Sequence, residues 1–260
     1  MRSHRVPESF HPRGVSFTLD PSAYHASRIA AAIGGGRYAH NWALGLVKDQ
    51  LDAHRAMVAL ALRQGARRAE AEEWAEDFLA PDPWGYAHRH FTLVELAIRQ
   101  GASVKEARKW ADQVAQGSPW SAYGLRRAWN RAKDEVAPWW EENSKESYSS
   151  AMAGLAAGLT NWRSSRNGTR KGAPVGFPRF QAKGAGSESV TFTTGSFGIV
   201  DAHHVRIPKL DQARSGSRNL VKVREDLTWA VEAADRGDLH LYSLTITKEP
   251  TGRLRGSFQA

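Results

Sequence analysis

Alternation of polar and apolar positions near the amino terminus predicts a first β-strand over Gly14–Leu19, closed by Asp20 and Pro21. From Pro21 the apolar spacing becomes helical, and a helix is expected through about Ile33. Three consecutive glycines at 34–36 predict a break there. A turn between helices is favoured over a nucleotide-binding loop, because no strand directly precedes the glycines and no Lys-Ser/Thr pair follows them.

A long helical block is predicted next. Apolar spacing after Tyr38 indicates a helix that continues through Leu62. Two later helices are expected at about 122–140 and 144–163, the second with Ser144 as its N-cap or, less favourably, Ser147. The second of these helices is rich in alanine and glycine. Such small residues allow close approach by another helix or by a nucleic-acid backbone, and the spacing alone does not decide between them.

An internal repeat lies within this helical block. Leu62–Ala66 recurs as Ile98–Ala102, an offset of 36 residues. The same offset relates further pairs: Glu70 and Glu106, Ala71 and Ala107, Trp74 and Trp110, and the Pro-Trp pairs at 83–84 and 119–120. One offset shared by so many identical residues predicts a duplicated helical unit. Trp74 and Trp110 are expected in the core or between the repeats, because tryptophan buries a large area.

The carboxy-terminal part changes character. After a polar, basic linker at 164–173, strands are predicted at 189–194, 198–200, 204–208, 241–247 and 254–258. One helix is expected between them, at about 218–235. Because a lone strand is unstable, the first strand is expected to pair with these later ones. The predicted fold class is therefore α+β, with a small β-barrel-like domain and a large helical domain inserted after its first strand.

Charge adds a candidate function to this picture. The chain has 36 lysines and arginines against 27 acids, a net charge of +9. Residues 161–184 contain no acid, whereas acidic residues cluster at 70–77. Trp162, Phe177 and Phe180 are interleaved with the cations of this basic stretch. Cations bind phosphates and aromatic rings can stack on bases, so the pattern predicts nucleic-acid binding.

Other chemistry is disfavoured by the sequence. The chain has no cysteine, which excludes disulfides, thiol nucleophiles and thiolate zinc sites. Its ten histidines show no convincing ligand spacing, and adjacent His203 and His204 would point to opposite faces of a strand. No metal site is therefore expected. No apolar run is long enough for a membrane helix, and no signal peptide is recognised, so a soluble, cytoplasmic protein without membrane partners is expected.

Three stretches carry a resemblance to a known family. Val15–Pro21, followed by Arg37–Leu44, is similar to the family's opening strand and its aromatic-Asn-x-x-Leu helix. Gly176–Phe180, with Lys183, resembles the family's most distinctive short motif. The third stretch comprises the segments at 205–210, 243–248 and 252–258, which resemble the strands that close its barrel. The family is that of the TnpB proteins of bacterial transposons, related to the compact type V CRISPR effectors. These are RNA-guided DNA nucleases.

The resemblance implies a domain organisation and a set of partners. Residues 1–20 and 166–260 would form a wedge domain, and residues 21–165 an inserted recognition domain that contains the duplication at about 62–120. Together they would bind guide RNA, the guide–target heteroduplex formed from double-stranded target DNA, and a short flanking DNA motif. The implied location is the bacterial cytoplasm, in association with the nucleoid.

The predicted nucleic-acid-binding residues combine the basic stretch with positions that the resemblance implies. Lys145, Ser149, Ser150, Thr193 and Thr194 would face the flanking DNA. The loop with Arg179, Phe180 and Lys183 would sit against nucleic-acid backbone. The other predicted nucleic-acid-binding residues are Arg163, Arg166, Arg170, Lys171 and Phe177.

No catalytic residue is expected in this chain. In the family, the catalytic carboxylates and a zinc ribbon follow the last barrel strand, and the chain is expected to stop before them. The acids nearest the carboxy terminus match no nuclease motif and are attributed to turns and helix surfaces: Asp211, Glu225, Asp226, Asp235 and Asp238. No cofactor is therefore expected here, whereas magnesium is expected for the nuclease domain of the parent protein.

The leading hypothesis is the nucleic-acid-binding part of an RNA-guided DNA endonuclease, with the absent nuclease domain as a further partner. The alternative is a free-standing protein of the same ancestry, either a nuclease-less, repressor-like RNA-guided DNA-binding protein or an RNA-binding module. An unrelated hydrolase is disfavoured, because no motif for a nucleophile with its base is visible.

Overall fold

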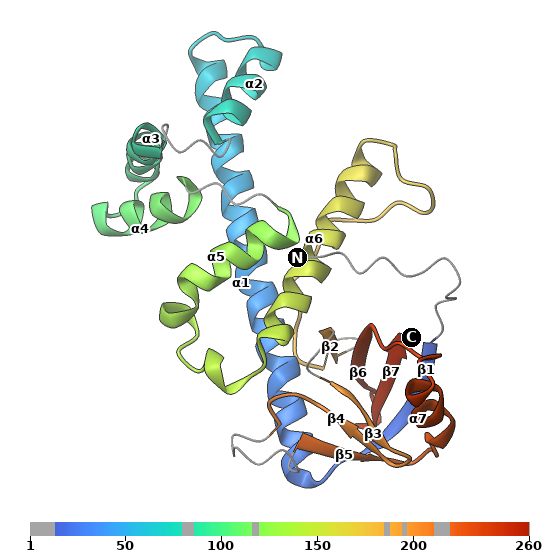
Figure 1. Cartoon of the computed structure of the whole chain (residues 1–260). Helices are drawn as coiled ribbons and strands as arrows, with labels where there is room; N and C mark the ends of the chain where they lie inside the picture. The colour runs from blue at the N-terminus through green and yellow to red at the C-terminus, as the bar shows by residue number, and fades with distance from the viewer. Residues whose placement is uncertain are drawn as a thin grey trace. The chain divides into compact units, whose positions relative to one another are not determined.

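The computed structural model describes residues 14–79, 86–115, 120–184, 188–193, 197–210 and 219–259. They belong to two compact units. The sheet unit comprises Met1–Tyr38, Asp134–Ala151 and Gln181–Ala260, and the helical unit comprises Ala39–Lys133 and Met152–Phe180. Two long helices, α1 (Ala23–Arg63) and α6 (Lys145–Arg166), contribute residues to both units (Figure 1). The predicted domain boundaries at residues 20 and 165 stay a prediction.

The sheet unit is built on an antiparallel sheet of seven strands, in the order β2-β6-β7-β1-β5-β4-β3 among the described residues. The strands are β1 (Gly14–Asp20), β2 (Glu188–Thr193), β3 (Gly198–Asp201), β4 (His204–Arg206), β5 (Leu220–Val223), β6 (Ser243–Lys248) and β7 (Leu254–Gln259). Gly14–Thr18 pair with β7, and Leu19 and Asp20 pair with β5. The prediction that the first strand pairs with later ones is confirmed. The described strands form an open sheet and not a closed barrel, because β2 and β3 are its two edges.

The prediction of one helix over 218–235 is wrong. Leu220–Val223 form strand β5 between β1 and β4, and only Thr228–Asp235 form a helix, α7. In the Leu-Val-Lys-Val sequence the two valines are buried and Lys222 is exposed, which is the period of a strand. Strand β5 pairs with β1 on one side and with β4 on the other, and these pairings supply its backbone hydrogen bonds. A pattern of four residues in the sequence does not reveal such distant partners.

The core of the sheet unit lies between the sheet and helix α1. Phe17, Phe192 and Phe258 are almost fully buried, and Ile29 and Ile33 of α1 pack against the same cluster. The Phe17 and Phe258 rings lie 4.9 Å apart between centroids. Gly256 pairs with Phe17 across β1 and β7, and a Cβ added at Gly256 would overlap the Phe17 ring. The absent side chain therefore provides the space that the ring fills.

The predicted break at residues 34–36 is also wrong, because α1 is uninterrupted through the three glycines (Figure 1). Ser22 caps the helix, its Oγ accepting from the His25 N–H at 3.2 Å. A Cβ at Gly36 would lie 3.1 Å from the Ser147 carbonyl oxygen, and one at Gly35 would lie 3.0 Å from the Asn143 side-chain nitrogen. The glycines thus mark the place where the start of α6 packs closely on α1.

The helical unit contains the duplication. The end of α1 with α2 (Arg68–Leu79), and α3 (Tyr86–Arg99) with α4 (Val104–Ala115), form two helical hairpins. Each turn has a glycine with positive φ, 91° at Gly65 and 97° at Gly101. The following alanine N–H donates back to the residue five positions earlier, at 3.1 Å in the first copy and 3.0 Å in the second. Repeated sequence positions therefore perform the same C-capping role in both copies.

The repeated glutamates have equivalent contacts in the two copies, whereas the repeated tryptophans differ in burial. Glu70 accepts from the Arg67 N–H, and Glu106 accepts from the Ser103 N–H, each at 3.1 Å. Both glutamates thus close the first turn of their helix. Trp110 is half-buried against the helical core, as predicted. Trp74 is 41% exposed, so it does not lie in the core, and its packing between the repeats stays a prediction.

The remaining helices differ from the prediction mainly at their ends. The helix expected at 122–140 ends earlier, as α5 (Ala122–Val136), and a short 3-10 helix, η1 (Trp140–Glu142), follows it. Helix α6 begins one residue after Ser144, whose Oγ accepts from the Glu146 N–H at 3.3 Å, so the predicted Ser144 cap is confirmed. Within the described residues, no helix has the length and apolar character needed to span a membrane.

Candidate nucleic-acid interface

The end of α6 carries a cluster of aromatic rings and arginines, all within the helical unit. The Arg163 guanidinium carbon lies 5.0 Å from the Trp120 ring centroid, and that of Arg166 lies 5.8 Å from the Trp162 centroid. The Trp120 and Trp162 centroids are 6.4 Å apart. Phe177 meets Trp162 edge to face at 4.9 Å. We call Trp120, Trp162, Phe177, Arg163 and Arg166 the ring–arginine cluster.

The segment Gly176–Phe180 packs against the helices of the same unit. A Cβ at Gly158 of α6 would contact the Pro178 ring at 3.4 Å, so at this point the neighbour of the small-residue face of α6 is the chain's own loop. The Lys48 ammonium lies 4.5 Å from the Phe180 centroid, and Phe180 stays 53% exposed. The His40 side chain is bonded to the Arg179 backbone, and burial lowers the His40 pKa.

The predicted cations of the basic stretch have different surroundings. Arg170 donates to Asn161 Oδ1 at 2.7 Å and to the Ala173 carbonyl at 3.1 Å, so it holds the linker in place. Lys171 and Arg179 are exposed. Lys183 is exposed as well, but it belongs to the sheet unit. The structure therefore gathers Arg163, Arg166 and Phe177 into one cluster and leaves Lys183 in a separate unit.

The ring–arginine cluster carries two exposed positive charges. Within the described part of the chain, neither Arg163 nor Arg166 forms an ion pair, and both are exposed. Residues 161–184 contain no acid. An anion that approached these guanidinium groups would therefore meet no carboxylate from this segment. Such surroundings favour the binding of a phosphate.

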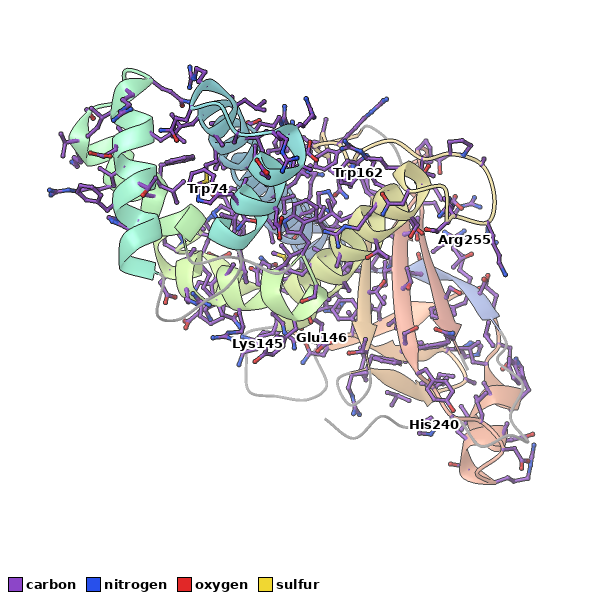
Figure 2. All side chains as sticks on the ribbon, turned by 90° about the horizontal axis from the view of Figure 1, so that it is seen from above. Trp74, Lys145, Glu146, Trp162, His240 and Arg255 are labelled. Atoms are coloured by element: carbon purple, nitrogen blue, oxygen red, sulfur yellow. The ribbon has the colours of Figure 1, made fainter. Side chains whose placement is uncertain are left out.

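The start of α6 forms the second part of the candidate interface, within the sheet unit. Lys145 is exposed on the first turn, and Ser149 and Ser150 are half-buried. Ser150 Oγ donates to the Ser147 carbonyl at 3.2 Å. Glu146 lies beside Lys145 (Figure 2) and accepts from the Thr193 N–H at 2.9 Å and from the Thr193 hydroxyl.

These contacts bring Thr193 and the first turn of α6 together, and residues of both were predicted to face the flanking DNA. The residue that joins them is Glu146, which sequence reasoning did not single out. Nearby, Asn143 Oδ1 and Ser147 Oγ are buried without a hydrogen-bond partner among the described residues. Thr194 lies outside the described residues.

Sequence reasoning missed two contacts of this region. Trp120 belongs to the ring–arginine cluster although its sequence signal is only that of the duplication, and Lys48 lies near the Phe180 ring. Trp120 Nε1 donates to Gln50 Oε1 at 3.0 Å, which joins the end of the repeat to α1. Both lie far in sequence from the basic stretch, and the sequence carries no signal that would have joined them to it.

The acidic residues of the sheet unit have structural contacts. Glu225 accepts from the Thr18 N–H at 2.6 Å and from its hydroxyl at 2.9 Å. Asp226 accepts from the N–H of Thr228, the first residue of α7, at 2.8 Å. Asp238 pairs with Arg236 at 2.9 Å, whereas Asp211 lies outside the described residues. The described residues contain no group of three or more histidines and acids placed to hold a metal ion.

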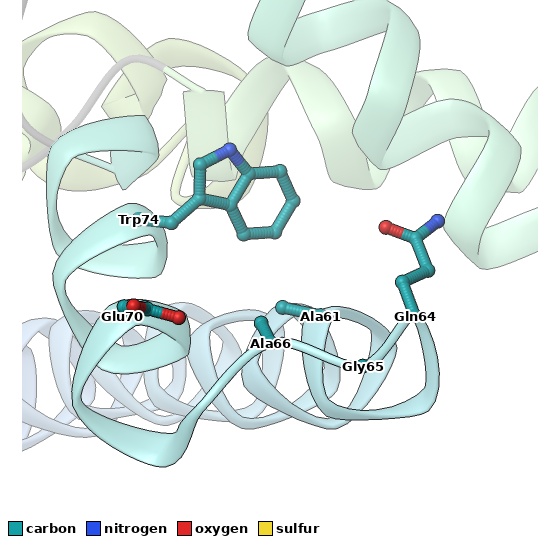
Figure 3. A pocket seen from close by; sticks show the side chains of 6 residues that line it. All are labelled: Ala61, Gln64, Gly65, Ala66, Glu70 and Trp74. Atoms are coloured by element: carbon teal, nitrogen blue, oxygen red, sulfur yellow. The ribbon is translucent and has the colours of Figure 1, made fainter.

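A pocket of about 450 Å³ lies beside the exposed Trp74 (Figure 3). It is lined by Ala61, Gln64, Gly65, Ala66, Glu70 and Trp74, from the first hairpin of the duplication. Hydrogen bonds from Arg67 lower the pKa of the Glu70 carboxyl and so favour its charged form. Because Arg67 is ion-paired with this carboxylate, the wall of the pocket offers no unpaired cation to a phosphate.

Comparison with known proteins agrees with the family resemblance. No protein-family model matches the chain. Proteins from two strains of Mycobacterium tuberculosis, each named "Putative RNA-guided DNA endonuclease", are 27% identical to it over 219 residues. The match covers 81% of this chain and 35% of each relative. The chain therefore spans about a third of the length of the curated relatives that it matches.

Proposed function

We propose that this chain is the nucleic-acid-binding part of an RNA-guided DNA endonuclease. In this proposal residues 1–20 and 166–260 act as the wedge domain and residues 21–165 as the recognition domain. They bind guide RNA, the guide–target heteroduplex and a short flanking DNA motif. The residues assigned to binding are those predicted from the sequence, and none is assigned to catalysis.

The observation that carries the proposal is the ring–arginine cluster. It presents two exposed guanidinium groups, without ion pairs among the described residues, on a segment that lacks acids. The similarity to the two mycobacterial relatives extends over most of the chain and gives the same class of partner. The start of α6 supports a second contact, because exposed Lys145 lies at a capped helix start where backbone N–H groups favour anions.

The experiment measures RNA binding as a function of salt. A fluorescent RNA hairpin is titrated with the purified chain at several salt concentrations, for the wild type and for Arg179→Glu/Lys183→Glu. If both residues neutralise phosphates, the slope of log affinity against log salt falls by roughly two, and affinity falls alike for unrelated sequences. The matched control is Lys105→Glu/Arg108→Glu, the same charge change at exposed positions of α4.

Two results would contradict the expected phosphate contacts, and each has a different meaning. Equal slopes for the wild type and the Arg179/Lys183 variant, with a lower melting temperature for the variant, would mean that these residues only hold the loop. Equal losses in the variant and the α4 control would mean that net charge alone attracts RNA. A third measurement adds target DNA and magnesium to the RNA complex. Cleavage above that of a mock preparation would contradict the assignment of binding without catalysis to this chain.

A further inference from the structure

We propose that the rings of the ring–arginine cluster orient Arg163 and Arg166 toward the phosphates of an RNA backbone, and that these rings do not stack on bases. The inference rests on the proposed function and names the part of the nucleic acid that is recognised. It adds Trp120 and Trp162 as positioning residues. It also replaces the expectation that all the rings interleaved with the basic stretch serve as platforms for bases.

An arginine already covers one face of each tryptophan. Arg163 lies over Trp120, and Arg166 lies over Trp162. Phe177 meets Trp162 edge to face, and Trp120 is the next ring beside it. All three rings are half-buried. A base needs an open π-face to stack, so stacking on the face that an arginine covers would require that arginine to leave its ring.

The stacked arginines keep their capacity for phosphate. A guanidinium is planar and carries its five N–H donors around its edge, so a ring against its face does not consume them. The edge can bind a phosphate through two parallel hydrogen bonds. A ring that holds the guanidinium in one orientation also reduces the side-chain freedom lost on binding, which is a general source of affinity.

The rings are themselves held in place. The Trp120 indole N–H donates to Gln50 at 3.0 Å, and Gln50 is buried on α1.

Arg163 and Arg166 are three positions apart in the last turns of α6, which places them as neighbours on one side of the helix. The negative end of the helix dipole favours cations there and repels phosphate, so attraction for an anion must come from the guanidinium groups.

Phe180 provides an internal contrast. It lies in the same unit and has a cation, Lys48, near its ring, but 53% of its surface is exposed. If any ring of this region stacks on a base, Phe180 is the one with an accessible face. If Phe180 stacks on a base, its replacement should weaken the binding only of RNA that has bases. Replacement of Trp120 should weaken binding whether or not bases are present.

The first test compares a single-stranded RNA with an abasic oligonucleotide of the same length and charge. Stacking of a base on an aromatic ring is worth about fivefold or more in affinity per base. For backbone recognition by the cluster, Trp120→Leu lowers affinity by the same factor for the normal and the abasic oligonucleotide. If Trp120→Leu weakens only the binding of the RNA that has bases, Trp120 is a stacking platform and the inference is overturned.

The second test is a double-mutant cycle between Trp120→Leu and Arg163→Gln. If Trp120 acts by orienting Arg163, each single variant weakens RNA binding, and Trp120→Leu has little further effect once Arg163 is replaced. The expected coupling is about two- to fivefold, from the strength of an exposed cation–π contact. The matched cycle pairs Trp120→Leu with Lys171→Gln, an exposed cation of the linker, and should be additive within error.

Conservative variants separate positioning from folding. Trp120→Phe keeps an aromatic face and loses the bond to Gln50, and it should retain most of the affinity. Arg163→Lys keeps the charge but loses the planar edge, and it should bind less tightly than the wild type. Additive effects of Trp120→Leu and Arg163→Gln would overturn the inference. So would a Trp120→Phe variant that binds as weakly as Trp120→Leu while melting at the wild-type temperature.

The failure of this inference and the failure of the proposed function give different results. If the Arg179/Lys183 variant loses salt-dependent RNA binding while the Trp120 and Arg163 variants bind like the wild type, only the role of the cluster is refuted. If the wild-type chain binds neither the RNA hairpin nor the single strand, the proposed function is refuted and the inference with it.

Discussion

The three glycines within α1 give a quantitative test of the packing between α1 and α6. In the interior of a helix, glycine costs about 1 kcal/mol relative to alanine. At Gly34 an added Cβ would have only the end of the Arg37 side chain near it, at 3.9 Å, which is an ordinary contact. Gly34→Ala should therefore stabilise the sheet unit by about 1 kcal/mol.

Gly36→Ala gains the same helix propensity but meets a backbone atom. The added Cβ would lie 3.1 Å from the Ser147 carbonyl oxygen, which is closer than an ordinary contact. Because this oxygen belongs to α6, it moves only if the helix moves, and overpacking of this kind costs about 1–3 kcal/mol. The net change expected at Gly36 is between zero and a loss of about 2 kcal/mol. The Gly34→Ala variant should therefore be more stable than the Gly36→Ala variant by about 1–3 kcal/mol.

The assay is hydrogen exchange of the β6 and β7 amides, because it reports the opening free energy of the sheet unit separately from the helical unit. Urea unfolding followed by circular dichroism provides the comparison for the whole chain. Equal stabilisation by Gly34→Ala and Gly36→Ala would refute the close contact between α1 and α6. Destabilisation by both would instead indicate that the glycines interrupt the helix, as the sequence pattern suggested.

Three further predictions concern the sheet unit. Gly256→Ala should lower its stability by about 1–3 kcal/mol, because the new methyl group overlaps the Phe17 ring, whereas Gly198→Ala, with open space around it, should change stability by less than about 1 kcal/mol in urea unfolding. The Glu188 pKa is lowered by the Gly184 N–H and by neighbouring cations, so its stabilising effect is complete at neutral pH and is lost as the pH falls through this lowered pKa. Glu188→Gln should therefore be less stable than the wild type at neutral pH and should lose less stability on acidification, and equal acid-unfolding profiles would contradict this. Lys145→Ala should weaken binding of the preferred flanking DNA by about 1–3 kcal/mol while RNA affinity is unchanged, and equal losses for a scrambled flank would indicate a phosphate contact only.

The sequence predicted those elements whose signal is local and regular. The first strand, the cap at Ser144 and the turns of the duplication all follow from residues within a few positions of each other. The sequence failed at residues 34–36 and 218–235, where a distant partner decides the structure. Glycine is tolerated within α1 because α6 needs its space, and β5 forms because β1 and β4 both pair with it. Neither partner is visible in a local window.

The candidate site shows the same limit. The prediction of a nucleic-acid surface rests on the charge and aromatic content along 161–184, because both are local properties of the sequence. Which cations face the solvent and which hold the linker could not be predicted. Arg170 is engaged by Asn161 and a carbonyl, whereas Arg163 is stacked on a tryptophan more than forty positions away. Assignments of single residues thus depend on tertiary contacts that spacing does not encode.

The arrangement of the rings also bears on how such a chain would discriminate among nucleic acids. Contacts to phosphates supply affinity that depends on salt but carries no sequence information. If the ring faces at the end of α6 are occupied by arginines, this part of the chain contributes binding to any RNA of suitable shape. Sequence would then be read by base pairing with a guide and by contacts elsewhere, such as those proposed for the start of α6. If the proposed function holds, these contacts would accept guides of different sequence, because contacts to phosphates do not depend on the guide's bases.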